Sequence, residues 1–188
     1  MTVDPPVILG PMAGSTNRAF RLLCRRGGAG LVCSEMISSN ALKYGNQKTE
    51  NLLLRTFEGE RPVSLQIFGG DPRTVAGAVP WAEQAGADVI DINMGCAVPK
   101  VRKSGAGVEL MAEPNQAVAI AAAVVERASV PVTVKMRSGL RVGDDGFLEL
   151  VRRLADVGVA AIALHARTVT QGFEGEADDW SEVEGLRV

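Results

Sequence analysis

Short apolar runs alternate with longer segments of helical spacing along this chain. Six short runs, each bounded by glycine, proline or polar residues, lie at residues 7–9, 31–33, 63–67, 89–92, 132–134 and 161–164. Apolar runs of this length between turn residues are typical of buried strands. Segments with the apolar spacing of helices lie between them, at residues 17–26, 72–84, 114–128 and 146–157. The pattern therefore predicts a repeated strand–helix unit.

Two of the predicted helices carry clear start signals. Asp71-Pro72 and Glu113-Pro114 each place an acidic residue before a proline at the first turn. Residues 180–188 have the pattern of a further helix that is just beginning. Strict alternation of strands and helices implies a parallel sheet, and near-continuous apolar strands imply burial on both faces. A doubly wound sheet and a (β/α)8 barrel both satisfy these expectations.

Each predicted strand ends on groups capable of hydrogen bonding or acid–base chemistry. In chain order these are Pro11-Met12-Ala13, Ser34-Glu35, Gln66, Asn93 with Cys96, Lys135 with Arg137, and His165 with Arg167. A doubly wound sheet needs such endings only at its switch point, whereas a barrel brings all of its carboxyl ends to one mouth. The pattern favours the (β/α)8 barrel. A barrel needs about eight strands and about 250 residues, so we expect a truncated one with six.

Composition narrows the class of protein. The 188 residues are 46% hydrophobic, as in one globular domain, and the formal net charge of −2 means that a nucleic acid needs a local basic patch. The three cysteines are an odd number at spacings that match no zinc pair, which favours a reducing cytoplasm and no metal. No segment resembles a signal peptide or a membrane span, and none indicates an obligate protein partner.

Several of the strand-end residues have more than one interpretation. Lys135 is either a lysine that extends its ammonium to solvent or a cation that faces a ligand with developing negative charge. His165 is either a satisfied core histidine or a catalytic group, and Gln66 either caps its strand or binds a flavin or base edge. Cys96 is a nucleophile, a proton donor, a metal ligand or a packing residue. Their shared position at strand ends favours function.

A basic loop follows Cys96. Lys100, Arg102 and Lys103 lie within four residues, and glycines follow them in the same loop. The cluster is either a solvated loop or a patch that binds phosphate groups. Cys24 and Cys33 lie in a predicted helix and strand, so packing is the expected role for both.

An ordered set of motifs resembles the tRNA-dihydrouridine synthase family of the bacterial type. The motifs are Gly10-Pro11-Met12-Ala13-Gly14, Asn17-Arg18-Ala19-Phe20-Arg21, Gln66-Ile67-Phe68-Gly69, Asp91-Ile92-Asn93-Met94-Gly95-Cys96, residues 100–107, Val134-Lys135-Met136-Arg137 and His165-Ala166-Arg167-Thr168. The resemblance covers essentially the whole chain. It implies an FMN-dependent (β/α)8 barrel that reduces uridine to 5,6-dihydrouridine in tRNA, with NADPH recharging the flavin.

The resemblance also implies roles for individual residues. Cys96 would donate the proton to C5 while hydride passes from flavin N5 to C6. The cofactor-binding residues would be Pro11, Met12, Ala13, Gln66, Asn93, Lys135 and His165. The tRNA-binding residues would be Asn93, Lys100, Arg102, Lys103 and Arg137.

The sequence departs from the family pattern in places. Ala97 and Asn17 stand where proline and aspartate are common, and the chain ends at Val188. Residues 1–188 would thus form a partial FMN-binding barrel without strands seven and eight and without the C-terminal helical tRNA-binding domain. The alternatives are a dehydrogenase of free pyrimidines, which the basic loop disfavours, and an inactive fragment that binds RNA weakly or acts as a scaffold.

Overall fold

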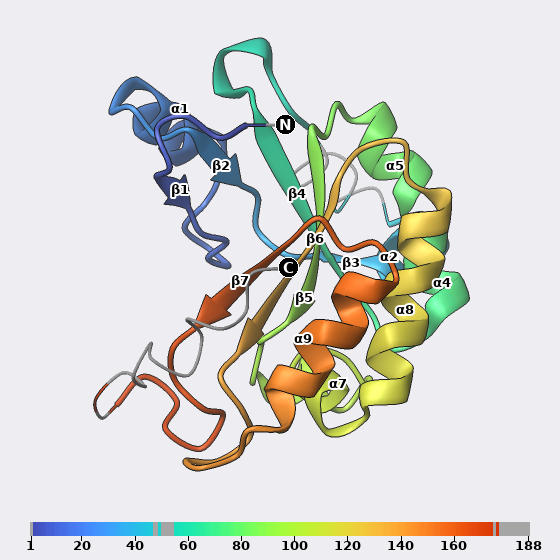
Figure 1. The fold of residues 1–188 in the computed structure, drawn as a ribbon. Coiled ribbons are helices and arrows are strands. Elements are labelled where there is room, and N and C mark those ends of the chain that lie inside the picture. The colour runs from blue at the N-terminus through green and yellow to red at the C-terminus, as the bar shows by residue number, and fades with distance from the viewer. Residues whose placement is uncertain (1, 47–48, 50–54, 175, 177–188) are drawn as a thin grey trace.

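The strand–helix repeat is present in the computed structural model, which describes residues 2–46, 49, 55–174 and 176 (Figure 1). All six predicted strands are confirmed, with bounds shifted by at most a few residues. The strands are β1 Ile8–Leu9, β2 Leu31–Cys33, β3 Ile37–Ser38, β4 Val63–Phe68, β5 Val89–Met94, β6 Val132–Arg137 and β7 Ala161–His165. The two-residue strand β3 was not predicted. The helix expected at 180–188 lies outside the described residues.

The strands form one parallel, curled sheet. Its order is β1-β2-β4-β5-β6-β7, and β3 pairs with β4 near the end opposite to β2. Each pair along this path is parallel, so the carboxyl ends of all strands lie at the same edge. Sequential neighbours in a curled parallel sheet are the arrangement of a (β/α)8 barrel, here as a half-barrel. The expected fold class is confirmed.

The helices connect the strands. They are α1 Arg18–Arg26, α2 Ser39–Lys43, α4 Pro72–Gly77, α5 Val79–Gln84, α6 Pro99–Arg102, α7 Glu109–Ala112, α8 Pro114–Arg127 and α9 Gly146–Asp156, with the 3-10 turn η1 Glu58–Glu60. Asn17 Oδ1 caps α1 by accepting from the Phe20 N–H at 3.2 Å. The prediction of one helix over 72–84 is wrong, because Pro80 lacks an N–H and the segment divides at Ala78 into α4 and α5.

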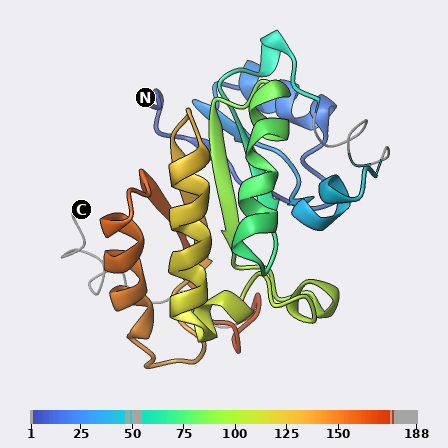
Figure 2. The same cartoon turned by 90° about the vertical axis from the view of Figure 1, so that its right-hand side faces the viewer.

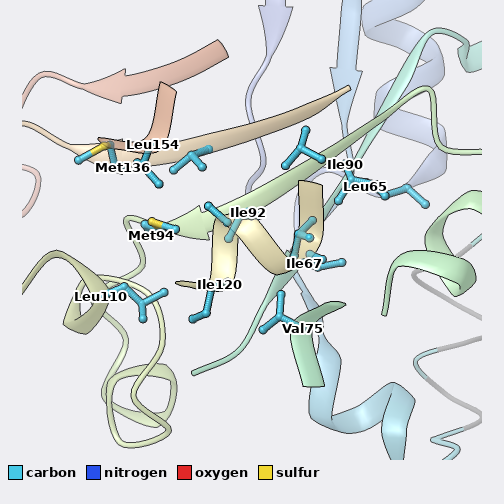
Figure 3. Close-up of a cluster of buried hydrophobic side chains, with 14 of the residues drawn as sticks. Leu65, Ile67, Val75, Ile90, Ile92, Met94, Leu110, Ile120, Met136 and Leu154 are labelled. Atoms are coloured by element: carbon cyan, nitrogen blue, oxygen red, sulfur yellow. The ribbon is translucent and has the colours of Figure 1, made fainter. Parts of the chain in front are cut away.

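Helices α4, α5, α8 and α9 cover one face of the sheet and enclose the main core. Figure 2 shows α9, α8 and the α4–α5 pair side by side in front of the strands, and α8 contacts both α4 and α9. Ile90 and Ile92 of β5 belong to the buried apolar cluster that also contains Ile120 of α8 and Leu154 of α9 (Figure 3). All four side chains are at most 1% exposed. This apolar layer fixes the strands that carry the site.

The expected burial on both faces holds for β5, in which all six residues are buried, but the face opposite the helices is polar. Side chains alternate across a strand, so Asp91 and Asn93 point away from the helices that their neighbours Ile90 and Ile92 contact. Cα partners in the register place Gln66 beside Asp91, and Asn93 beside Lys135. The inner face of the half-barrel therefore carries polar residues that lie within strands recognised in the sequence as apolar runs.

Candidate active site

A cavity of about 320 Å3 opens at the carboxyl ends of the strands. It gathers nine predicted site residues, from the loop after β1 to the end of β7. The lining residues are Pro11, Met12, Ala13, Met36, Gln66, Asn93, Gly95, Cys96, Val98, Lys135, Arg137, His165 and Phe173. The carboxyl edge is where barrel enzymes hold their chemistry. This cavity is the candidate active site.

Gln66 of β4 and Asn93 of β5 form its floor, and a third buried polar side chain, Asp91 of β5, lies beneath them. Gln66 Nε2 donates to Asp91 Oδ2 at 2.6 Å, and Asn93 Nδ2 donates to Gln66 Oε1 at 2.9 Å. Thr133 Oγ1 of β6 donates to the second Asp91 oxygen at 2.6 Å. Burial raises the pKa of the Asp91 carboxyl, and the bonds from Thr133 and Gln66 and the charge of Lys135 oppose that rise. The floor is thus a connected network with little freedom to rotate.

Lys135 lies beside Asn93 on the same inner face. It lines the cavity and is partly buried, so the ammonium does not simply extend into solvent. Burial lowers its pKa, and the negative charge of Asp91 opposes this fall while the positive charge of Arg137 adds to it. The arrangement places a positive charge at the cavity wall, with a counter-charge below it.

Cys96 stands on the loop that follows β5. Its backbone N–H donates to Asn93 Oδ1 at 2.9 Å, and the N–H of Gly95 reaches the same oxygen at 3.2 Å. The far end of the loop returns to this point, where the N–H of Val108 donates to the Cys96 carbonyl at 3.1 Å. The thiol is free and partly exposed. Of the cysteines in the described residues, Cys96 alone lines the cavity.

Arg137 joins two loops of the cavity wall. Its guanidinium donates to the Gly95 carbonyl at 3.1 Å and to the Thr168 and Gly172 carbonyls at 3.1 and 2.8 Å. It also lies 5.5 Å from the ring centroid of Phe173. The guanidinium is buried, and several of its N–H groups already donate to these loop carbonyls. Arg137 is therefore placed to hold the two loops as well as to make the substrate contact we expected.

His165 ends β7 beside Arg137, and its ring lies 6.0 Å from that of Phe173. Burial lowers the pKa of the imidazole, and the positive charges of Arg137, Lys135 and Arg167 lower it further. The side chain is therefore neutral at pH 7 and can donate from one ring nitrogen and accept at the other.

The loop that supplies Pro11, Met12 and Ala13 is held from below by a buried ion pair. Arg21 Nε contacts Glu60 Oε2 at 2.8 Å, and Arg21 Nη1 donates to the Thr16 carbonyl at 2.8 Å. Thr16 in turn bonds Met12 through its hydroxyl at 3.1 Å. The apolar wall of the cavity therefore depends on α1.

The basic residues after Cys96 lie apart from the cavity. Lys100, Arg102 and Lys103 are exposed on or just after α6, and Arg102 forms an ion pair with Glu109. Arg102 and Lys103 line a separate cavity together with Glu109 and other residues. The loop expected here contains a short helix, α6, and its far end returns to Cys96. Its charges flank the site from outside.

Sequence analysis missed four lining residues, namely Met36, Gly95, Val98 and Phe173. Gly95 lies inside a quoted motif, and Val98 follows it closely. Phe173 is 84% exposed on the loop after β7, eight residues beyond His165. Nothing local in the sequence marks Phe173, because it reaches the cavity only through the path of its loop.

The residues present fit a planar, acceptor-rich ring such as that of FMN. Both oxygens in the Gln66–Asn93 pair already accept hydrogen bonds within the floor, whereas each amide NH2 has a second hydrogen available. Together with Lys135 they make the floor rich in donors, and Met12 and Ala13 supply an apolar wall. Among the described residues, no group of three or more His, Cys, Asp or Glu side chains could hold a metal ion. No helix within those ranges is long and apolar enough to cross a membrane.

Comparison with known sequences identifies relatives from one protein family. A family model described as dihydrouridine synthase matches residues 8–188. The tRNA-dihydrouridine synthase B of Vibrio cholerae serotype O1 is 42% identical over 173 residues, which cover 92% of this chain and 53% of that protein. The protein of the same name from Xanthomonas campestris is 41% identical over 177 residues, 94% of this chain and 53% of its own. The chain thus spans about half the length of the curated relatives it matches.

Solved structures of low sequence identity share the fold. A phosphonopyruvate hydrolase complex with oxalate and Mg superposes with a TM-score of 0.60 at 19% identity, covering 97% of this chain and 63% of the other. A 2,3-dimethylmalate lyase gives 0.56 at 12% identity, covering 85% and 56%. At such identities the likeness concerns the arrangement of strands and helices alone.

Proposed function

We propose, since this chain belongs to the dihydrouridine synthase family, that it carries the redox site of an enzyme that reduces uridine to 5,6-dihydrouridine in tRNA. The observation that carries the proposal is the single cavity that joins Cys96 to Asn93, Lys135 and His165. FMN bound there would supply hydride to C6 of the base, with NADPH as its reductant. The cellular compartment proposed for this reaction is the cytoplasm.

Cys96 is the proton donor in this proposal. Reduction of the C5–C6 double bond needs one proton at C5, so the donor must remain protonated until it is used. The bonds from the Gly95 and Cys96 amides to Asn93 hold the thiol-bearing residue at the cavity. A free cysteine on a fixed loop is suited to deliver a proton from one direction.

Gln66, Asn93 and Lys135 would hold a bound flavin from the floor. Their available N–H groups would donate to its acceptor atoms, and the Lys135 ammonium would stabilise negative charge that develops on the cofactor during reduction. Pro11, Met12 and Ala13 would supply an apolar surface for the ring, and neutral His165 would add a hydrogen bond. Desolvation of the lysine would strengthen its interaction with that charge.

The substrate is proposed to be a tRNA whose target base leaves the stack. A base inside a folded RNA cannot reach the floor of this cavity unless it is extruded. Arg137 and Asn93 contact the base, and Lys100, Arg102 and Lys103 bind backbone phosphates from their exposed positions on the rim. Residues 1–188 act as a partial barrel, to which the two remaining barrel strands and a C-terminal helical domain would add further contacts with tRNA.

Cys96→Ala tests this function in the full-length protein that carries the sequence. Loss of a positioned proton donor is expected to slow dihydrouridine formation by about 10²- to 10⁴-fold, measured by mass spectrometry of digested tRNA. The matched control is Cys24→Ala, a cysteine of α1 that does not line the cavity. We expect the control to retain near-normal turnover.

Unchanged turnover of the Cys96→Ala variant would remove the proton-donor role. Free uracil and dihydroorotate serve as competing substrates in the same assay. If either reacted faster than tRNA, the substrate assignment would pass to a free pyrimidine.

A further inference from the structure

The hydrogen bonds beneath the cavity run in one direction, and the backbone fixes that direction. The N–H groups of Gly95 and Cys96 only donate, so the Asn93 side chain must present its oxygen to them. Its amide nitrogen then faces Gln66 and donates to it, so Gln66 must present Oε1 as the acceptor. The side-chain amides of Asn93 and Gln66 are therefore each held in one of their two possible orientations.

The chain of bonds ends on Asp91. With Oε1 directed at Asn93, Gln66 has Nε2 directed at Asp91 Oδ2, 2.6 Å away, and this oxygen must accept. Asp91 is 4% exposed, and its other oxygen accepts from Thr133 Oγ1. It therefore has no free oxygen directed into the cavity, and it does not line the cavity wall. A buried acceptor in this position acts through the residues above it.

We propose that Asp91 is a positioning residue, whose Oδ2 fixes the orientation of the Gln66 and Asn93 amides and, through them, the loop that carries Cys96. The inference rests on the proposed function only where it treats Cys96 as the proton donor. The orientation itself is a property of this chain, with or without substrate.

The physical reason is the cost of a reversed amide. If Gln66 turned over, its NH2 would face the Asn93 NH2, and two donors would meet in a buried site. Asn93 would then have to turn as well, which would set its NH2 against the Gly95 and Cys96 N–H groups. An acceptor at Asp91 Oδ2 stabilises the one orientation in which every contact pairs a donor with an acceptor.

Asp91 is also a counter-charge for Lys135, and one substitution separates the two roles. Asp91→Asn removes the charge, but its side-chain oxygen can still accept from Gln66 while its NH2 donates to the Thr133 hydroxyl. Asp91→Leu is of similar size and removes both the charge and the acceptor. The conservative variant should therefore preserve the loop, and the apolar variant should release it.

The experiment measures the loop directly, without turnover. Hydrogen exchange of the Gly95 and Cys96 amides and the rate of Cys96 alkylation by iodoacetamide are followed in the full-length protein. We expect Asp91→Leu to lower amide protection at least about fivefold, the loss of roughly one net hydrogen bond, and to raise alkylation of Cys96. Asp91→Asn should remain within about twofold of wild type in both readouts.

Two controls distinguish release of the Cys96 loop from other effects of the substitution. Thr133→Val removes the other partner of Asp91 but leaves the bond to Gln66, so the loop should stay protected. Alkylation of Cys24 in α1 reports general unfolding. If Asp91→Leu unfolds the protein, Gln66→Leu interrupts the same chain of bonds one residue further along and is expected to release the loop.

The proposal fails if the apolar variant leaves the Gly95 and Cys96 amides protected. It also fails if Asp91→Asn or Thr133→Val loosens the loop as much as Asp91→Leu does, because the acceptor would then not be the cause. None of these readouts depends on tRNA reduction, so a failure here is distinguishable from a failure of the proposed function.

Discussion

Cys33 and Cys96 are chemically alike but lie in opposite environments on the inner side of the half-barrel. Cys96 lies at the open cavity, whereas Cys33 of β2 is 6% exposed beside Ser64. Burial raises the pKa of the Cys33 thiol to about 12, and the negative charge of Asp91 adds to the rise. The packing role expected for Cys33 thus fits its surroundings, and its thiol stays protonated wherever the protein is folded near neutral pH.

The raised pKa of Cys33 predicts a loss of stability in alkali. Between its ordinary value of 9.0 and about 12, the folded state keeps the proton that the unfolded state has released. The free energy of unfolding therefore falls as pH rises, by about 1.4 kcal/mol per pH unit from this group. Denaturant unfolding at pH 8 and pH 10.5 measures the slope. Cys33→Ala should flatten it, and an equal slope in both proteins would contradict the assignment.

The segment from Cys96 to Val108 is the element on which the site depends most. It contains α6, returns to Cys96 through the Val108 amide, and closes at Gly107 with φ +64°. A Cβ on Gly107 would be in hard contact with the Cys96 carbonyl oxygen. Gly105 has a similar φ of +69° but open space around it. The two glycines share a left-handed backbone conformation, which would strain any residue with a Cβ, and they differ in what lies beside them.

Gly107→Ala should therefore displace Cys96, whereas Gly105→Ala should only strain the turn. We expect dihydrouridine formation to fall at least tenfold in the first variant, because a misplacement of about 1 Å at a reacting group can cost about 10²-fold. The second should lose stability, by about 1 kcal/mol, with little change in turnover. Equal losses of turnover in the two variants would show that the close contact with Cys96 is unimportant.

Elements that depend on local spacing were predictable, and those that depend on contacts across the sheet were not. The strand candidates and the cap of α1 by Asn17 follow from apolar runs and cap chemistry that act within a few residues. The buried pair Arg21–Glu60 joins residues 39 positions apart, and no local pattern predicts it. The same holds for Phe173, which reaches the cavity through the path of its loop.

At the scale of the molecule, the sheet formed by the described residues has two edges without a further strand partner. Along its path β1 pairs only with β2, and β7 only with β6, within the residues that the structure describes. Val7 and Ile8 at one edge are 58% and 52% exposed. Unpaired strand edges with apolar side chains readily pair with other chains. The convergence of strand ends was predictable from the sequence, because parallel topology alone brings them to one edge.

Residues 1–188 produced alone should therefore self-associate and fail to retain FMN. Size-exclusion chromatography with light scattering and the visible absorbance of the eluted protein measure both properties. The full-length protein provides the control. A monodisperse, yellow preparation of residues 1–188 would show that the half-barrel is sufficient for flavin binding.

Because side chains alternate along β5, adjacent residues should differ in the substitutions that they tolerate. Ile90 and Ile92 are replaceable by other side chains of similar volume, because they fill a helix layer. Asp91 and Asn93 between them are limited by which atoms donate and which accept. A one-residue insertion or deletion within this strand would exchange the two sets and lose packing and polarity together. The six residues of β5 should accept substitutions at every second position and accept no change of length.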